Sequence, residues 1–123
     1  MFNTTSGPSN SIAPLVQPLN EEWGGGDSDV VFFEMSDQNS DTDPLLLAFQ
    51  EQYDHTFPGV SRDGGSVAAV QPYKDGTFGP WVSTPMFAVI APDGTVAYDV
   101  KGANNQATIA AIDAAITATG AVK

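Results

Sequence analysis

Two serines on either side of a Gly-Pro pair are the first residues whose types and spacing could do chemistry. They form the stretch Ser6-Gly7-Pro8-Ser9, which lies directly before an amphipathic run. A serine nucleophile needs a base within hydrogen-bond reach, and the only histidine, His55, lies far along the chain in a loop after a predicted second helix. We therefore expect Ser6 and Ser9 to cap a helix rather than to hydrolyse a substrate.

Acidic residues form a second candidate set. Asp37, Asp41 and Asp43, or Asp27 with Asp29, could supply oxygen ligands for calcium. Their spacing does not fit an EF-hand loop, so a solvated acidic loop is the preferred interpretation. The chain has no cysteine, which excludes disulfides and thiolate metal sites. The sequence therefore predicts no metal and no cofactor.

A third set lies before Thr84-Pro85, where Phe78 and Trp81 could line a groove for a peptide or could pack against the first helix. The lone histidine, His55, is interpreted as a surface or partly packed residue. Neither aromatic residues nor a single imidazole specify a reaction by themselves.

Length and charge limit the classes of partner. The 123 residues fit one domain, 1–123. Its 15 acidic and 4 basic residues give a net charge of −11, which argues against binding nucleic acid or an anionic membrane, because both need a basic patch. No apolar run approaches the roughly 20 residues of a membrane span, and the polar residues that soon follow Met1 argue against a signal peptide.

Helical periodicity marks the first and last elements. Pro14 and Pro18 lie inside the first pattern and predict a bend or an early end, and Gly24-Gly25-Gly26 stops it. Near the C-terminus, isoleucines at helical spacing predict a helix with Gly120 as its stop. The two apolar stripes are Ile12, Leu15, Val16, Leu19 and Trp23, and Ile109, Ile112 and Ile116.

Strand and helix patterns alternate between these ends. Residues 29–36 predict a strand buried on both faces, because the run is short, β-rich and nearly continuously apolar. Asp43-Pro44 predicts the N-cap and first-turn proline of a second helix, with an apolar face of Leu45, Leu46, Phe49 and Tyr53.

The second half predicts an extended piece at 56–60, a short helix within 64–73 that ends near Pro72, and strands at 85–90 and 95–100 around a tight turn. This order predicts an α/β sandwich with parallel crossovers and a terminal antiparallel hairpin.

The chain resembles the thioredoxin-like family at two places. That family carries Cys-Gly-Pro-Cys at the start of a helix with a proline several residues in, and Ser6-Gly7-Pro8-Ser9 with Pro14 matches it except for the serines. Thr84-Pro85 is similar to the family's cis-proline loop. The resemblance implies a three-layer sandwich with a mixed sheet, a C-terminal β-hairpin and a final helix. It also implies a bacterial periplasmic or extracellular location.

The resemblance implies a thiol-disulfide oxidoreductase in which the first cysteine attacks a substrate disulfide and the second resolves the mixed disulfide. A serine hydroxyl stays protonated and forms no disulfide, so this chain is expected to be redox-inactive. The alternative is a non-enzymatic module that binds a protein or peptide by backbone pairing at Thr84 and Pro85. A third interpretation is a structural domain of a longer secreted protein.

Three structural predictions follow from the resemblance. The Thr84-Pro85 bond is cis, and Ser6 lies close to Pro85. The first central strand is truncated, because only Met1-Phe2-Asn3 precedes the serine motif. Either this stub pairs in the sheet, or a second chain fills the place by self-association, or the gap stays open.

Overall fold

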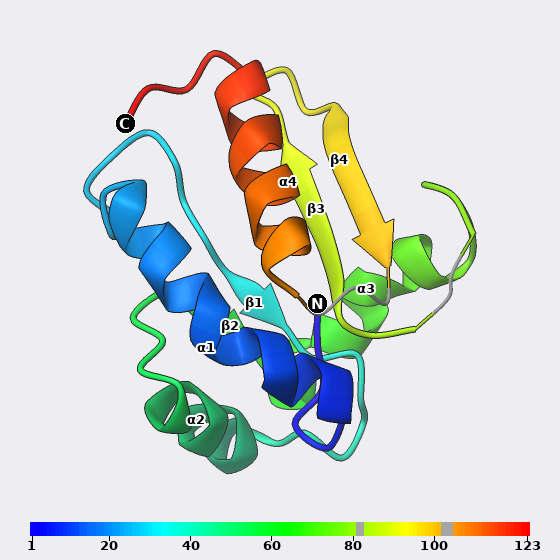
Figure 1. Cartoon of the computed structure of the whole chain (residues 1–123). Coiled ribbons are helices and arrows are strands. Elements are labelled where there is room, and N and C mark those ends of the chain that lie inside the picture. Colours follow the sequence, from blue (N-terminus) through cyan, green and yellow to red (C-terminus); the bar gives the residue numbers. More distant parts are fainter. Residues whose placement is uncertain (81–82, 102–104) are drawn as a thin grey trace.

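The structure, a computed structural model, describes residues 1–80, 83–101 and 105–123. Its described residues form a mixed α/β arrangement (Figure 1), as the sequence predicts. In chain order the elements are α1 (Gly7–Glu22), β1 (Glu34–Met35), α2 (Asp43–Gln52), β2 (Gly59–Val60), the 3-10 turn η1 (Arg62–Gly64), α3 (Ser66–Lys74), β3 (Met86–Ile90), β4 (Val96–Lys101) and α4 (Gln106–Ala118).

The N-terminal residues join two small sheets. β1 pairs in parallel with β2, and β3 pairs antiparallel with β4. The N–H of Phe2 donates to Met35 O at 3.0 Å, and Phe2 O accepts from Asp37 N at 2.9 Å. On the other side, Met1 and Met86 exchange two hydrogen bonds, of 2.9 and 2.7 Å. Of the three predicted alternatives, the pairing of the N-terminal stub is therefore the one observed, with the spatial order β2, β1, residues 1–3, β3, β4.

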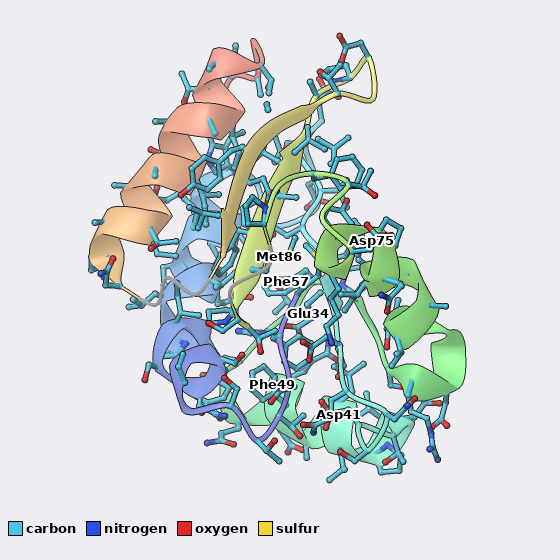
Figure 2. The ribbon with its side chains drawn as sticks, turned by 90° about the vertical axis from the view of Figure 1, so that its right-hand side faces the viewer. Glu34, Asp41, Phe49, Phe57, Asp75 and Met86 are labelled. Carbon is cyan, nitrogen blue, oxygen red and sulfur yellow. The ribbon has the colours of Figure 1, made fainter. Side chains whose placement is uncertain are left out.

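Helices cover the sheet from two sides. Figure 2 shows α1 and α4 on one side of the strands and α3 on the other. Between the strands and the pair α1 and α4 lies an apolar cluster of Leu19, Trp23, Ile112 and Ile116, extended by Val30, Phe32, Phe87, Val89 and Tyr98. A second cluster at the opposite end of α1 contains Phe2, Ala13, Leu46 and Phe49. α1 thus contacts both halves of the core.

α1 continues through both of its prolines, so of the predicted bend or early end the early end does not occur. Pro14 and Pro18 are four residues apart and exposed, so the missing N–H groups lie on the solvent side of the helix. The opposite side carries buried Ile12, Ala13 and Leu19. Tertiary packing along this stripe outweighs the local cost of the prolines.

The strand predicted at 29–36 is much shorter, covering only Glu34 and Met35. Its pairing partners set this limit, because β2 has two residues and the N-terminal segment adds one bridge, Phe2 to Ser36. Residues 30–33 have the composition of a strand but no described neighbour to pair with. The predicted return strand begins one residue later than expected, at Val96.

Two helix boundaries also differ from the predictions. Thr42 holds the N-cap position of α2 and Asp43 is its first residue, while the predicted core residue Leu45 is exposed. α3 continues past Pro72 to Lys74. Pro72 lies in the last turn of this nine-residue helix, so its missing N–H removes one intrahelical bond close to the helix end.

Candidate functional site

The Ser-Gly-Pro-Ser stretch forms the N-terminus of α1. Ser6 is the N-cap, and its Oγ accepts a hydrogen bond from Ser9 N at 3.2 Å. Ser9 is buried, and its Oγ accepts from the N–H of Asn3 at 3.4 Å. Gly7 and Pro8 are exposed in the first turn, where a proline loses no helix bond. The predicted capping role of Ser6 is confirmed, and it leaves Ser6 the more accessible of the two serines.

The predicted cis peptide bond is confirmed at Thr84-Pro85. Both residues are buried, and Asn3 connects them to the serine loop by donating from Nδ2 to Thr84 Oγ1 at 3.1 Å. The side chains of Ser9 and Thr84 are therefore each one hydrogen bond away from Asn3. The close approach of Ser6 to Pro85 stays a prediction, because no contact of this pair is described.

Asp41 ties the residues before the serines to the next strand. Its carboxylate is buried and accepts from Thr4 N at 3.0 Å, from the Thr4 hydroxyl, from Ser36 Oγ at 2.6 Å and from Gln38 Nε2 at 3.0 Å. Burial raises the pKa of Asp41, but the hydrogen bonds from Ser36 and Thr4 outweigh it and hold the pKa below its usual value. The carboxylate is therefore ionised at neutral pH.

The predicted solvated acidic loop is wrong at two of its members. Asp41 and Asp37 are both buried, and Asp37 lies 3.5 Å from Lys74 Nζ and accepts from Asn3 Nδ2 at 3.2 Å. Asp43 accepts from Ser61 Oγ at 2.5 Å. Asp37, Asp41 and Asp43 therefore each hold a loop through their own hydrogen bonds, and they do not form one cluster. Within the described residues, no three His, Cys, Asp or Glu side chains gather closely enough to hold a metal ion.

Of the two interpretations of His55, the partly packed residue is confirmed and the surface residue is wrong, because the residue is half-buried and its imidazole is held on both sides. Its side chain is 2% exposed, with Nδ1 at 3.1 Å from Glu34 Oε2 and Nε2 at 2.7 Å from Ala13 O. The ring also stacks on Phe57. Burial lowers the pKa of His55, but the hydrogen bond and charge of Glu34 outweigh it and raise the pKa.

Both ring nitrogens of His55 face oxygen acceptors, so both donate and the ring is an imidazolium paired with Glu34. Neither nitrogen is left to activate Ser6. A serine hydrolase centre is therefore not supported by the geometry of the described residues.

Comparisons with known proteins give no relative. No family model, no curated protein and no solved structure matches the chain. The arrangement of the site itself must carry any functional argument.

One of the two aromatic candidates, Phe78, belongs to the described residues. Phe78 is 40% exposed and packs against Tyr73 of α3, with ring centroids 4.8 Å apart. Trp81 lies outside the described residues. No helix among the described residues is long and apolar enough to span a bilayer.

Sequence reasoning missed Asn3, Glu34 and Asp41 as members of this region. Asn3 is close to the serines in sequence, but nothing in the sequence indicates that it reaches Thr84, 81 positions away. Asp41 is one of several candidate acids in the sequence, and nothing there distinguishes it from Asp37 or Asp43. Its burial depends on Thr4 and Ser36 converging on it, which no local pattern indicates.

Proposed function

We propose that the chain is a thioredoxin-like domain of the thiol-disulfide oxidoreductase type in which serines occupy both redox positions. The observation that carries the proposal is the link through Asn3, which bonds to Ser9 Oγ and to Thr84 Oγ1. It puts the start of α1 beside a cis-proline, and these are the two separate places at which the sequence resembles the family. The layers seen in Figure 2 and the order of the strands agree with the three-layer sandwich that this family implies.

In this proposal the chain has no dithiol chemistry, because it contains no cysteine. A cysteine at the N-cap of a helix has a lowered pKa, because the helix N-terminus favours the thiolate. The thiolate forms a bond to one sulfur of a substrate disulfide and expels the other, and a second thiolate then displaces the substrate. The hydroxyls of Ser6 and Ser9 can do neither step, so their remaining role is to cap the helix and fix the loop.

The experiment is a double reversion, Ser6→Cys with Ser9→Cys, assayed by insulin turbidity with dithiothreitol as reductant. We expect the double variant to accelerate precipitation, whereas the unchanged chain and the Ser6→Cys single variant do not, because the single variant lacks the resolving thiol. A double variant that melts like the parent yet adds nothing to the rate of dithiothreitol alone would contradict the proposal.

A second candidate is a peptide-binding module that uses the backbone of Thr84. In the described residues no hydrogen bond occupies the N–H or C=O of Thr84, although its hydroxyl is held by Asn3. Phe78, which is exposed and precedes the cis-proline in the sequence, is the aromatic candidate for contact with such a peptide. A Thr84→Pro change removes the N–H and should abolish peptide capture, while Thr84→Val keeps the N–H and should retain it. Equal capture by both variants would contradict this candidate.

The resemblance that motivates the family assignment also motivates a periplasmic or extracellular location in bacteria. A structural domain of a longer secreted protein would be silent in both assays above. Fractionation of cells that express the chain in its native context would test the location.

A further inference from the structure

The tripeptide Asp-Gly-Thr occurs twice in this chain, and its two copies are built alike. Residues 75–77, the α3 copy, follow α3, and residues 93–95, the hairpin copy, connect β3 to β4. In each copy the aspartate carboxylate accepts from the N–H and the hydroxyl of the threonine, at 3.0 and 2.6 Å in the α3 copy and at 2.9 and 2.7 Å in the hairpin copy. All six residues are exposed, and the two glycines have φ of 90° and 88°. The two copies can therefore be compared bond by bond.

One main-chain hydrogen bond distinguishes the copies. The N–H of Gly94 donates to Ala91 O at 2.9 Å, which fixes the peptide group between Asp93 and Gly94 in the hairpin turn. Among the residues that the structure describes, no hydrogen bond uses the N–H of Gly76 or the C=O of Asp75. The hydroxyl and the N–H of the following threonine lower the pKa of Asp75 and of Asp93 alike. The copies therefore differ in how freely the peptide group after the aspartate can rotate.

Rotation of this peptide group is the motion that an internal reaction of Asp-Gly requires. In that reaction the backbone nitrogen after the aspartate attacks the side-chain carbonyl carbon and closes a succinimide ring. At Asp75 ψ is −1°, so the nitrogen of Gly76 lies beside the Asp75 nitrogen, and a turn about the Cα–C bond must bring it to the carboxyl carbon. Glycine has no side chain to hinder this approach. At Asp75 the turn breaks no hydrogen bond of the rotating peptide group in the described part of the chain.

We propose that Asp75 is a site of isoaspartate formation and thereby a methyl acceptor for an isoaspartate-repair methyltransferase. The nitrogen of Gly76 forms a bond to Cγ of the protonated Asp75 carboxyl, and the carboxyl hydroxyl leaves with the amide proton as one water. Water then adds across one of the two carbonyl–nitrogen bonds of the succinimide. Opening at Cγ restores aspartate, and opening at the main-chain carbonyl carbon gives isoaspartate with a free α-carboxylate. The reaction needs no oxidant or cofactor, and the final mass is unchanged.

The third Asp-Gly pair is held more firmly than Asp75 and Gly76. Gly64 lies in η1, and its N–H donates to Ser61 O at 3.0 Å. The Asp63 carboxylate also accepts from Asp43 N at 2.9 Å. Ring closure at Asp63 must therefore first break a main-chain hydrogen bond, as it must in the hairpin copy.

Isomerisation at this position changes the main chain beside the candidate site. It inserts one methylene group into residue 75, directly after Lys74, whose ammonium group lies 3.5 Å from the Asp37 carboxylate. Asp37 in turn accepts from Asn3 Nδ2. Asp75 is the C-cap of α3 (Figure 2), and its N–H donates to Gln71 O at 2.9 Å. The modification therefore alters the end of α3, and it goes beyond the proposed function because it uses neither a cysteine nor a substrate.

The test compares the two copies in one sample. The folded protein is aged at neutral pH and digested with chymotrypsin, because Phe78 and Phe87 separate the two copies. The peptides are then methylated by an isoaspartyl methyltransferase with labelled S-adenosylmethionine. We expect label to accumulate at Asp75 at least about five-fold faster than at Asp93, which is the factor that one hydrogen bond of ordinary net strength contributes. Ageing in urea removes the turns, so both peptides should then gain label at similar rates.

A pair of conservative variants identifies the reacting carboxyl. Asp75→Glu keeps the charge but moves the carbonyl carbon one methylene farther from the Gly76 nitrogen, so labelling of this peptide should stop. Asp93→Glu is the matched control and should leave labelling at Asp75 unchanged. Both positions are exposed, so both variants should melt as the parent does.

Three results would overturn the proposal. The folded protein could gain label at similar rates at Asp75 and Asp93, or chiefly at Asp63, which would show that the free N–H does not select the site. It could gain no label at Asp75 while the chain aged in urea does. Label could also persist in Asp75→Glu, which would place the reaction at another residue of the peptide. None of these results bears on the cysteine reversion.

Discussion

Asn3 and Asp41 fix the start of α1 more than the serines themselves do. Ser6 and Ser9 contribute one cap bond and one long hydrogen bond from Asn3. Asn3 reaches Thr84 and Asp37, and Asp41 holds both main-chain and side-chain groups of Thr4. The geometry of the loop is thus set by residues outside the motif, so changes at the serines should leave it intact.

Removing the Asp41 carboxylate should destabilise the fold strongly. Asp41→Ala leaves the buried hydroxyl of Ser36 and the partly buried donors of Thr4 and Gln38 without their acceptor, at a cost of about 3 kcal/mol. Urea denaturation at neutral pH measures this cost, and the exposed residue Asp27 supplies a control, because Asp27→Ala should change stability by less than about 0.5 kcal/mol. Similar losses for the two variants would show that Asp41 does not hold the loop.

The stabilisation by Asp41 should also depend on pH. Its pKa is lowered in the folded state, so the ionised carboxylate stabilises the fold above the unfolded value of about 3.9. This contribution is lost as the pH falls through the lower folded value. We expect the difference in unfolding free energy between the parent and Asp41→Asn to shrink below about pH 4. A constant difference down to pH 2 would contradict the assignment.

His55 should titrate above its ordinary value. As the only histidine, it gives one imidazole signal in an NMR titration, and we expect a pKa above about 6.5. The pair with Glu34 then stabilises the fold fully below about pH 6.5, and this contribution is lost as the pH rises through the folded pKa. In Glu34→Gln the charge is gone and burial dominates, so the pKa should fall. A value at or below 6.5 in the parent would disprove the imidazolium pair.

At the scale of elements, α1 contains a proline whose replacement should stabilise the protein. Pro18 is exposed and lacks the N–H that would bond to Pro14 O. Pro18→Ala should raise the unfolding free energy by about 1–2 kcal/mol. Alanine restores the helix hydrogen bond, and part of this gain is offset because the unfolded chain without the proline has more conformational entropy. Pro8→Ala is the matched control, since proline in the first turn costs no bond. Equal melting temperatures for the two variants would contradict the prediction.

The helices and the hairpin could be predicted because their signals are local. The stripe from Ile12 to Trp23, the stop at Gly120 and the turn after Ala91 each lie within a few residues of what they control. Strand lengths could not be predicted, because they depend on pairing with distant segments. Phe33, for example, has a strand-like sequence around it but lies outside β1, since no neighbouring segment among the described residues pairs with it. The motif residues around Ser6 and Thr84 can be found from the sequence, whereas Asn3 and Glu34 cannot, because their partners lie far along the chain.

At the scale of the whole molecule, acidic residues far outnumber basic ones, 15 against 4. Ion pairs of the described side chains include Lys123 with Glu22 and Asp113, Arg62 with Asp63, Lys74 with Asp37, and His55 with Glu34. With a net charge of −11, repulsion among the remaining carboxylates opposes the compact state.

Added salt should therefore stabilise the protein. Raising ionic strength from about 0.01 M to about 0.1 M shortens the screening length from about 30 Å to about 10 Å, and we expect the melting temperature to rise by several degrees. Choline chloride should act like sodium chloride, because screening does not depend on the ion. A rise with sulfate only would indicate exclusion of the salt from the surface instead.

The pairing of Met1 and Phe2 has a mechanical consequence. In the described residues, the two halves of the sheet are connected by four main-chain hydrogen bonds through this two-residue segment. A sheet under tension usually frays from its outer strands, but here the fewest bonds lie at the centre. A force applied to the first residue would act on these four bonds before it reached β2 or β4. The molecule would open from the middle, and its first force peak would be low.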